Sequence, residues 1–154
     1  MTTRLVLVVG TLVVALLTGP ASPALAAGLT EDARSLRTSV IQLTQDYERD
    51  YGPRVSAAER AELTTLSAQA RRQMTALVGA IRKAERSDRA ADWRTARTVH
   101  ASALAAAETN FERAAALLQP RLSLGEQLRA YSDYTRTLRE FQQLGDRIPR
   151  TTGR

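Results

Sequence analysis

The sequence predicts an all-α protein, an antiparallel up-down-up-down four-helix bundle. Three observations lead to this fold class. After Thr30, apolar residues recur at spacings of three and four along most of the chain, which is the period of an amphipathic helix. Glycine and proline divide this pattern at Gly52-Pro53, Pro120 and Pro149. Almost no segment after Thr30 has the alternating pattern of a β-strand.

The first helix is expected to begin at Thr30, whose side chain is a candidate N-cap. Glu31 and Asp32 follow in the first turn, where the helix dipole favours negative charge. The apolar stripe of this helix consists of Ala33, Leu36, Val40, Leu43 and Tyr47. Gly52 and Pro53 are expected to end it, because glycine can supply a left-handed cap and proline cannot continue a helix.

The second helix is expected to begin after Ser56, which forms a capping-box sequence with Glu59. Its apolar stripe consists of Leu63, Leu66, Ala70, Met74, Leu77, Ile81 and Ala84. The phase of this stripe does not continue, because the next large apolar residue, Trp93, falls on the opposite face. We therefore expect a turn near Ser87-Asp88, where either residue can cap a third helix. One long helix through both segments is the competing architecture.

The third helix carries an apolar stripe that ends before Pro120, and it consists of Trp93, Ala96, His100, Leu104, Ala107, Phe111, Ala114 and Leu118. A second capping-box sequence, Ser123 to Glu126, begins the fourth helix. The fourth stripe is expected to lie inside the bundle or at its rim, and it consists of Leu124, Leu128, Tyr131, Tyr134, Leu138, Phe141 and Leu144. Leu77 and Phe111 are expected to be deeply buried.

The first 26 residues predict a cleaved secretory signal peptide. Arg4 supplies a short charged start, and Leu5 to Leu17 form an apolar run that is interrupted only by one glycine and one threonine. Pro20 and Pro23 break the following stretch, and Ala24-Leu25-Ala26 has the small-x-small pattern of a cleavage site. We expect cleavage directly after this pattern, and a retained N-terminal anchor is the alternative.

Cleavage would leave a helical bundle domain, residues 27–148, and a tail, residues 149–154, that is expected to be disordered. The expected location is secreted or extracytoplasmic. The chain has no cysteine, which excludes disulfides, thiolate metal sites and a lipid-anchored N-terminal cysteine. The formal net charge is +6, and loss of Arg4 lowers it to +5.

Six basic residues gather around the predicted turn between the second and third helices, and we call this set the basic tip. They are Arg82, Lys83, Arg86, Arg89, Arg94 and Arg97. Glu85, Asp88 and Asp92 lie among them, which leaves a local charge of +3. This surface suits an anionic partner such as lipid head groups, a cell-wall polymer or an acidic protein. The interleaved acids also suit an ordinary solvated surface with pairs four residues apart.

His100 is the only histidine, and it falls close to the inward stripe of the third helix. Met74 lies at nearly the same height in a helical hairpin, and methionine with histidine is an established pair of haem-iron ligands. A haem or metal carrier that uses Met74 and His100 is therefore an alternative function. Methionine at an inward position is more often core filling. The residue three before His100 is Arg97, which departs from the Glu-x-x-His pairs of di-iron bundles.

No catalytic constellation stands out in the sequence, which has one histidine, no Gly-x-Ser-x-Gly motif and no glycine-rich phosphate loop. The sequence predicts a non-enzymatic, exported interaction module of the cell envelope that needs no cofactor. Its basic tip is expected to bind an anionic component or another protein. Nucleic acid is not an expected partner, because the few aromatic residues lie on the core stripes rather than among the arginines.

An envelope chaperone is a further alternative. The chain is similar to small exported helical chaperones in being basic, helical and free of cysteine. Those proteins carry a Leu-Thr-x-x-Gln motif, which this chain begins at Leu29-Thr30, Leu43-Thr44 and Leu63-Thr64 but never completes with glutamine. The resemblance implies an exposed apolar surface that holds unfolded polypeptide.

Overall fold

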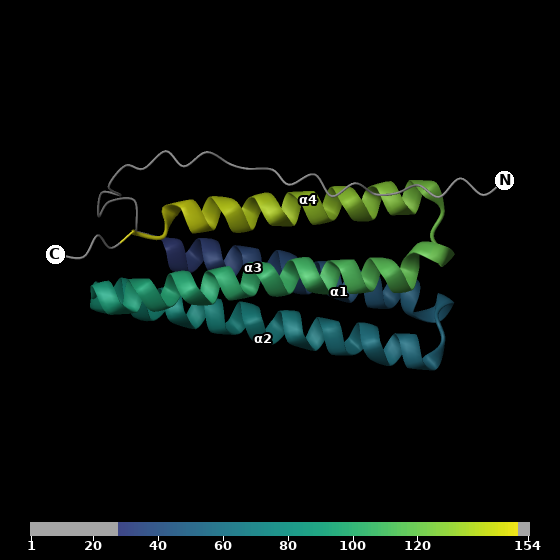
Figure 1. Ribbon diagram of the computed structural model, residues 1–154, viewed down its shortest axis with the longest axis horizontal. Coiled ribbons are helices and arrows are strands. Elements are labelled where there is room, and N and C mark those ends of the chain that lie inside the picture. The colour runs from purple at the N-terminus through teal and green to yellow at the C-terminus, as the bar shows by residue number, and fades with distance from the viewer. Residues whose placement is uncertain (1–27, 151–154) are drawn as a thin grey trace.

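A computed structural model describes residues 28–150, and these form an antiparallel four-helix bundle (Figure 1). The helices are α1 (Leu29–Tyr51), α2 (Ala57–Ser87), α3 (Ala90–Leu118) and α4 (Leu124–Arg147). The 3-10 turns η2 (Gly52–Arg54) and η3 (Gln119–Arg121) lie in two of the connections. The predicted fold class is confirmed. The predicted signal peptide, its cleavage position and residues 151–154 of the predicted tail lie outside the described residues.

The turn between α2 and α3 is confirmed, so the single long helix is excluded. Asp88 adopts the left-handed conformation, with φ 48, and its N–H donates to the carbonyl of Ala84 at 2.8 Å. The N-cap of α3 is Arg89, whose side chain makes no capping bond. The prediction that Ser87 or Asp88 caps α3 is therefore wrong. Instead the Asp88 carboxylate accepts a hydrogen bond from Nε1 of Trp93 at 3.0 Å.

Both predicted capping boxes are confirmed. At Ser56 and at Ser123 the hydroxyl accepts the backbone N–H three residues on, and the carboxylate of Glu59 or Glu126 accepts the serine N–H at 2.8 Å. Each box satisfies two backbone donors that a helix start leaves without partners. These local contacts fix where α2 and α4 begin.

Two predicted details of α1 are wrong. Its N-cap is Gly28, with φ 87, while Thr30 lies inside the first turn and is buried. The Thr30 side chain contacts Glu85 of α2, and this distant partner removes it from the capping role. At the other end Gly52 keeps a right-handed conformation, with φ −51. The chain tightens there into η2, because Pro53 has no N–H with which to continue the helix.

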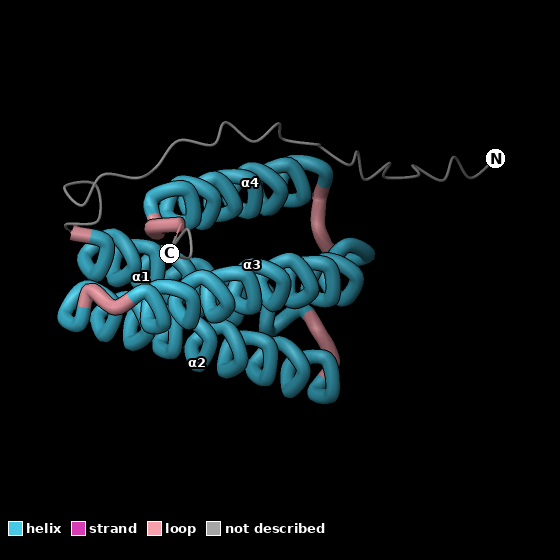
Figure 2. The backbone as a smooth tube through the Cα atoms, turned by 60° about the vertical axis from the view of Figure 1, so that its left-hand side comes forward, coloured by secondary structure: helices cyan, strands magenta, loops and turns pink. Residues whose placement is uncertain are grey.

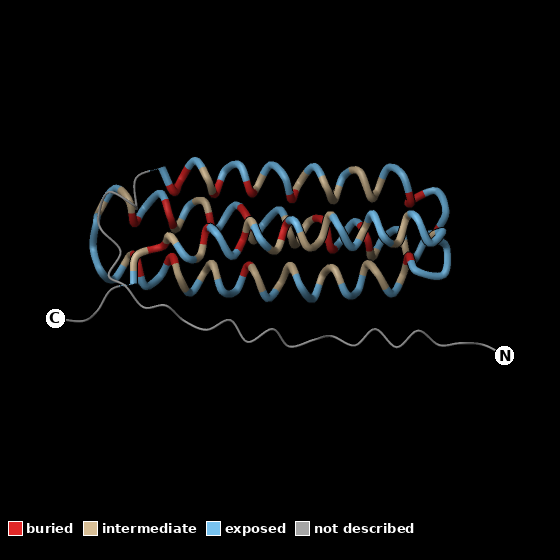
Figure 3. Tube along the Cα trace, turned by 90° about the horizontal axis from the view of Figure 1, so that it is seen from above, coloured by how far each residue is buried: buried red, intermediate tan, exposed pale blue. Residues whose placement is uncertain are grey.

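The largest core cluster lies at the end of the bundle that carries the α2–α3 turn. Side chains from all four helices meet in it: Leu29, Ala33, Leu36, Val40, Met74, Leu77, Ile81, Ala84, Trp93, Ala96, Ala103, Phe141, Leu144 and Ile148. Leu77 is 0% exposed, as predicted. A smaller cluster at the opposite end consists of Tyr51, Val55, Leu63 and Leu118. Figure 3 shows these buried positions along the inner sides of the helices.

Helix α4 has its buried residues in its C-terminal half. Phe141 and Leu144 are buried, whereas Leu124, Leu128 and Tyr131 are 72%, 62% and 53% exposed. The prediction that the stripe lies inside the bundle or at its rim is therefore wrong for its first three residues. Its steps of three and four residues average less than 3.6, so the stripe winds about 160° around the helix between its two ends. Figure 2 shows α4 beside α1 and α3, with α2 on the far side.

Phe111 is half-buried, so the prediction of deep burial is wrong. Its ring stacks on Tyr134 of α4, with ring centres 3.7 Å apart and planes 6° from parallel. The stack lies in the half of the bundle where α4 leaves its apolar residues in solvent. Phe111 therefore has one aromatic neighbour across the helix interface rather than an enclosing core.

The start of α4 depends on an ionised Glu126. Backbone and hydroxyl hydrogen bonds from Ser123, followed by one from Arg54 at 2.6 Å, lower the pKa of Glu126 from 4.5 to about 2. A carboxyl with a lowered folded-state pKa stabilises the fold above its unfolded pKa. This stability is lost as the pH falls from about 4.5 through about 2.

We expect acidification from pH 5 to pH 2 to loosen the first turns of α4. Amide hydrogen exchange should show protection factors of residues 124–130 falling in this window. Glu126→Gln should reduce that pH dependence, because glutamine does not titrate and the hydrogen bonds from Ser123 and Arg54 favour the ionised carboxylate of Glu126. Glu59→Gln removes the equivalent carboxylate of α2 and is the matched control, which should leave the acid response of α4 in place. An unchanged acid response of α4 in Glu126→Gln would contradict this assignment.

Candidate functional site

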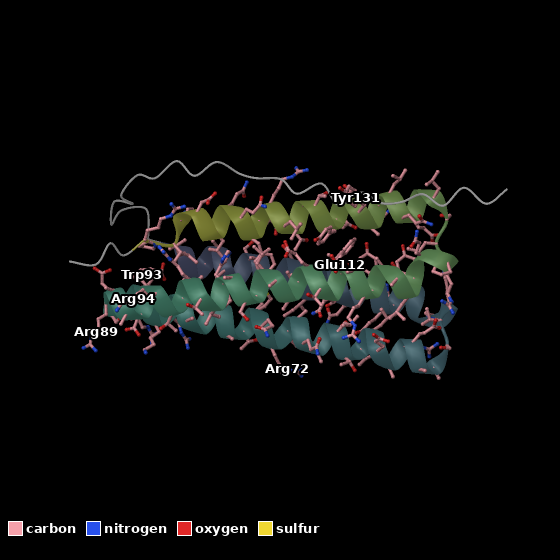
Figure 4. The ribbon with its side chains drawn as sticks, in the orientation of Figure 1. Arg72, Arg89, Trp93, Arg94, Glu112 and Tyr131 are labelled. Carbon is pink, nitrogen blue, oxygen red and sulfur yellow. The ribbon has the colours of Figure 1, made fainter. Side chains whose placement is uncertain are left out.

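The basic tip lies at the end of the bundle where α2 ends and α3 begins. Figure 4 labels Arg89 and Arg94 there, with Trp93 between them in sequence. The same end holds the start of α1 and the end of α4 (Figure 1). The contact of Glu85 with Thr30 joins α2 to α1, and the contact of Arg97 with Pro149 joins α3 to the segment after α4.

The acids of the tip have structural partners of their own. Glu85 accepts the N–H of Thr30 at 3.2 Å and also its hydroxyl, which joins α2 to the first turn of α1. Asp88 holds the indole of Trp93. In the sequence analysis Glu85 and Asp88 counted only as negative charges beside the arginines. In the structure each carboxylate also accepts a hydrogen bond within the fold.

Asp92 is the third acid, and from α3 it contacts two residues of α2 next to the turn. The ammonium group of Lys83 lies 2.8 Å from its carboxylate, and the hydroxyl of Ser87 donates to it at 2.7 Å. These two hydrogen bonds, from Lys83 first, lower the pKa of Asp92. Lys83 therefore has an ion-pair partner within the fold, unlike a free cation of the tip.

Four arginines of the tip have no ion-pair partner among the described residues. Their side chains are exposed, and among the described residues none forms an ion pair: Arg82, Arg86, Arg89 and Arg94. Arg97 is half-buried, and its guanidinium donates to the carbonyl of Pro149 at 3.3 Å. Of the six predicted binding residues, Lys83 and Arg97 are thus engaged in the fold.

An open hollow of about 290 Å³ runs along the α2 side of the tip, lined by Gly79, Arg82, Lys83, Arg86 and Ser87. A guanidinium group offers two parallel N–H donors that match a phosphate or carboxylate. The arginines lie on α2, on the turn and on α3, so they spread over one end of the molecule. This spread suits several anionic groups in one extended partner.

Met74 and His100 have separate structural roles. Met74 is 1% exposed and packs in the large core cluster, which includes Phe141. The Nε2 atom of His100 lies 2.8 Å from the carbonyl oxygen of Phe141, and the two rings are 6.1 Å apart. These residues do not line the open hollow beside the tip or a larger one on α1 and α2. Residues 28–150 hold no group of three or more histidine or acidic side chains placed to bind a metal ion.

Gly145 explains how His100 reaches α4. A Cβ atom at position 145 would lie 2.6 Å from Cε1 of His100, so only a glycine leaves room for the ring. Sequence reasoning placed His100 on the inward stripe but missed this contact. The available signal was a glycine within the fourth helix, where glycine is unfavourable unless packing requires it.

A larger open hollow, about 670 Å³, lies on α1 and α2 away from the tip. It is lined by Glu48, Thr64, Ser67, Ala68, Arg71, Arg72, Thr75 and Ala76. The Oε1 atom of Glu48 is buried and has no hydrogen-bond partner within residues 28–150. Sequence reasoning missed this polar groove, because its residues share no motif and come together only through packing of the two helices.

The helices of residues 28–150 include none that is both long enough and apolar enough to cross a membrane. Comparisons of the chain with protein-family models, with curated proteins and with solved structures gave no match.

Proposed function

We propose that this protein is an exported, non-enzymatic module of the cell envelope that binds an anionic partner through the basic tip. The observation that carries the proposal is the set of four exposed arginines without an ion-pair partner among the described residues. The acids beside them are engaged: Glu85 with Thr30, Asp88 with Trp93, and Asp92 with Lys83 and Ser87. Because these three acids have other partners within the fold, the four arginine side chains remain exposed to solvent.

The partner that fits this surface presents many phosphate or carboxylate groups. Arg82 and Arg86 lie on α2, Arg89 on the turn and Arg94 on α3, so the charges spread over two helix ends and the turn between them. An anionic lipid surface and a phosphate-bearing polymer share the chemistry that guanidinium groups recognise. The apolar segment at Leu5 to Leu17 supports export, which places the tip among such envelope components.

We expect the protein to bind vesicles that contain anionic phospholipid, and Arg86→Glu combined with Arg89→Glu to weaken binding about 30-fold or more. Each lost contact near a charged membrane contributes about 1 kcal/mol. Cosedimentation across a salt series measures this, and salt should weaken binding because the Debye length falls to about 3 Å at 1 M. A soluble polyphosphate competitor distinguishes a polymer partner from a lipid one.

Mass spectrometry of the exported chain should show Ala27 as its first residue.

The matched control is Arg71→Glu combined with Arg72→Glu, which changes the net charge equally at exposed positions on α2 outside the tip. This control should retain most of the binding. Equal losses in the two double variants would show attraction by net charge alone, which contradicts the proposal. Failure of the unmodified protein to bind anionic vesicles or polyphosphate at low salt would also contradict it.

A further inference from the structure

The open hollow beside the basic tip is lined by five residues of α2, and we call it the tip hollow. They are Gly79, Arg82, Lys83, Arg86 and Ser87. Three of the five are basic and none is acidic. The volume of the hollow is about 290 Å³. A water molecule takes about 30 Å³ in the liquid, so the hollow has room for a phosphoryl group and the atoms that carry it.

Gly79 lies inside α2 at a place where packing does not require a glycine. Glycine is unfavourable within a helix, because it loses more backbone freedom on folding than any other residue. At Gly145 the ring of His100 explains the glycine. At Gly79 a Cβ atom would have no contact within 4 Å beyond its chain neighbours and its own helix backbone. The missing side chain therefore leaves open space in the wall of the tip hollow.

Arg82 and Arg86 follow Gly79 at spacings of three and four residues, so the three positions share one face of α2. Like charges four residues apart destabilise a helix. Both arginine side chains are exposed, and neither forms an ion pair within residues 28–150. The acid three residues after Arg82 is Glu85, whose carboxylate accepts hydrogen bonds from Thr30 instead. The described part of the fold thus leaves the repulsion of the two arginines uncompensated.

Lys83 and Ser87 are held in place by a residue of α3. The ammonium group of Lys83 and the hydroxyl of Ser87 both contact the carboxylate of Asp92, at 2.8 Å and 2.7 Å. Asp92 itself does not line the tip hollow. Two of the five lining side chains are therefore ordered before a ligand arrives, which lowers the entropy cost of binding.

We propose that the tip hollow binds a phosphoryl group of the anionic partner, which the guanidinium groups of Arg82 and Arg86 hold in the space that Gly79 leaves open. A phosphoryl group is tetrahedral, so its oxygen atoms can face both guanidinium groups at once. A carboxylate is planar, and its two oxygens match a single guanidinium. A helical glycine and a pair of like charges then have one explanation, because sequences depart from local rules chiefly at functional sites. The inference rests on the proposed function of the tip and narrows its partner to one that carries phosphate.

Titration with methyl phosphate, followed by amide NMR at constant ionic strength, tests the site in the chain expressed from Met1 and purified as the cell processes it. We expect saturable shifts of the amide signals of residues 79–87. Malonate is the control, because at pH 8 it carries two negative charges, as a phosphate monoester does. It should bind more weakly at the same amides. Equal affinity for the two anions, or phosphate shifts spread over arginines throughout the chain, would overturn the proposal.

Gly79→Leu fills the wall of the hollow without changing the charge. Leucine favours the helix more than glycine does, so thermal stability should be kept or raised. The affinity for methyl phosphate should fall about tenfold or more, which is the loss of one hydrogen bond to a charged group. Gly125→Leu on α4 is the matched control, since a Cβ atom there also has no contact within 4 Å. Unchanged phosphate affinity of a folded Gly79→Leu variant would overturn the proposal.

Arg82→Lys tests the guanidinium group itself, because lysine keeps the charge and lacks the planar pair of donors. This variant should bind methyl phosphate more weakly than the unmodified protein. Arg72→Lys is the control on the same helix, and Figure 4 labels Arg72 away from the end that carries Arg89 and Arg94. It should keep the full affinity. Equal affinities of the two variants would mean that positive charge alone holds the ligand, which contradicts the proposal.

The source of the phosphoryl group can be a lipid head group or a phosphate-bearing polymer. Gly79→Leu should weaken binding to vesicles that contain phosphatidic acid in the first case, and binding to soluble polyphosphate in the second. Either loss supports the phosphoryl site. If Gly79→Leu binds both as the unmodified protein does, while Arg86→Glu combined with Arg89→Glu loses both, the phosphoryl site is wrong and the proposed function of the tip still holds.

Discussion

Replacement of Phe141 by alanine is expected to lower the free energy of unfolding by about 3–5 kcal/mol. Phe141 is 0% exposed and heads the fully buried side chains by volume. It joins α4 to the large core cluster, in which Leu36 of α1, Leu77 of α2 and Ala96 of α3 also take part. Removing its ring deletes buried apolar area and leaves a cavity that long packed helices cannot fully close.

Urea denaturation of Phe141→Ala measures this loss, and Phe111→Ala is the matched comparison. Phe111 is half-buried and has Tyr134 as its stacking partner, so its loss should cost less than half as much. Leu77→Ala should again cost about 2–5 kcal/mol, because Leu77 is 0% exposed. Equal losses for Phe141→Ala and Phe111→Ala would mean that α4 packs evenly along its length, contrary to the structure.

The helices could be predicted because local sequence determines most of their boundaries. Ser56 with Glu59 and Ser123 with Glu126 satisfy backbone donors within four residues, so no knowledge of the fold is needed to recognise them. The break at Ser87-Asp88 was visible as a change in the phase of the apolar stripe. At Thr30 the same local reasoning was wrong, because the partner of its side chain lies 55 residues away.

The inward face of α4 could not be predicted from its stripe. A stripe that winds around the helix can face the core at one end only, and the sequence does not say which end. The structure places Phe141 and Leu144 inward and leaves Leu124 and Leu128 in solvent. Phe111 is only half-buried because it lies beside this part of α4, where its ring stacks on Tyr134.

The members of the basic tip could be predicted from their spacing around one turn, but their separate roles could not. Lys83 and Arg97 share charge and sequence neighbourhood with the other four basic residues. They differ because Asp92 and the carbonyl of Pro149 lie within reach of them in the folded chain. Which cations stay free depends on tertiary contacts, which a count of charges along the sequence does not contain.

Gly145→Ala is expected to destabilise the protein by about 1–3 kcal/mol, which is the usual cost of overpacking. Glycine-to-alanine changes inside helices otherwise stabilise by up to about 1 kcal/mol. The difference comes from His100, whose Cε1 atom would lie 2.6 Å from the new Cβ atom. Gly125→Ala is the matched control on the same helix, because a Cβ atom at position 125 has no neighbour within 4 Å. Thermal denaturation should therefore move in opposite directions for the two variants.

A double-mutant cycle with His100→Ala identifies the cause of the Gly145→Ala loss. His100→Ala removes both the ring and its contact with the carbonyl of Phe141, so it should itself destabilise the protein. In that background Gly145→Ala no longer meets a ring, and it should become neutral or stabilising, as at position 125. The two changes should thus be strongly non-additive, as expected for residues in direct contact. Additive losses would mean that the cost of Gly145→Ala does not come from His100. They would contradict the close contact of α3 and α4 at this point.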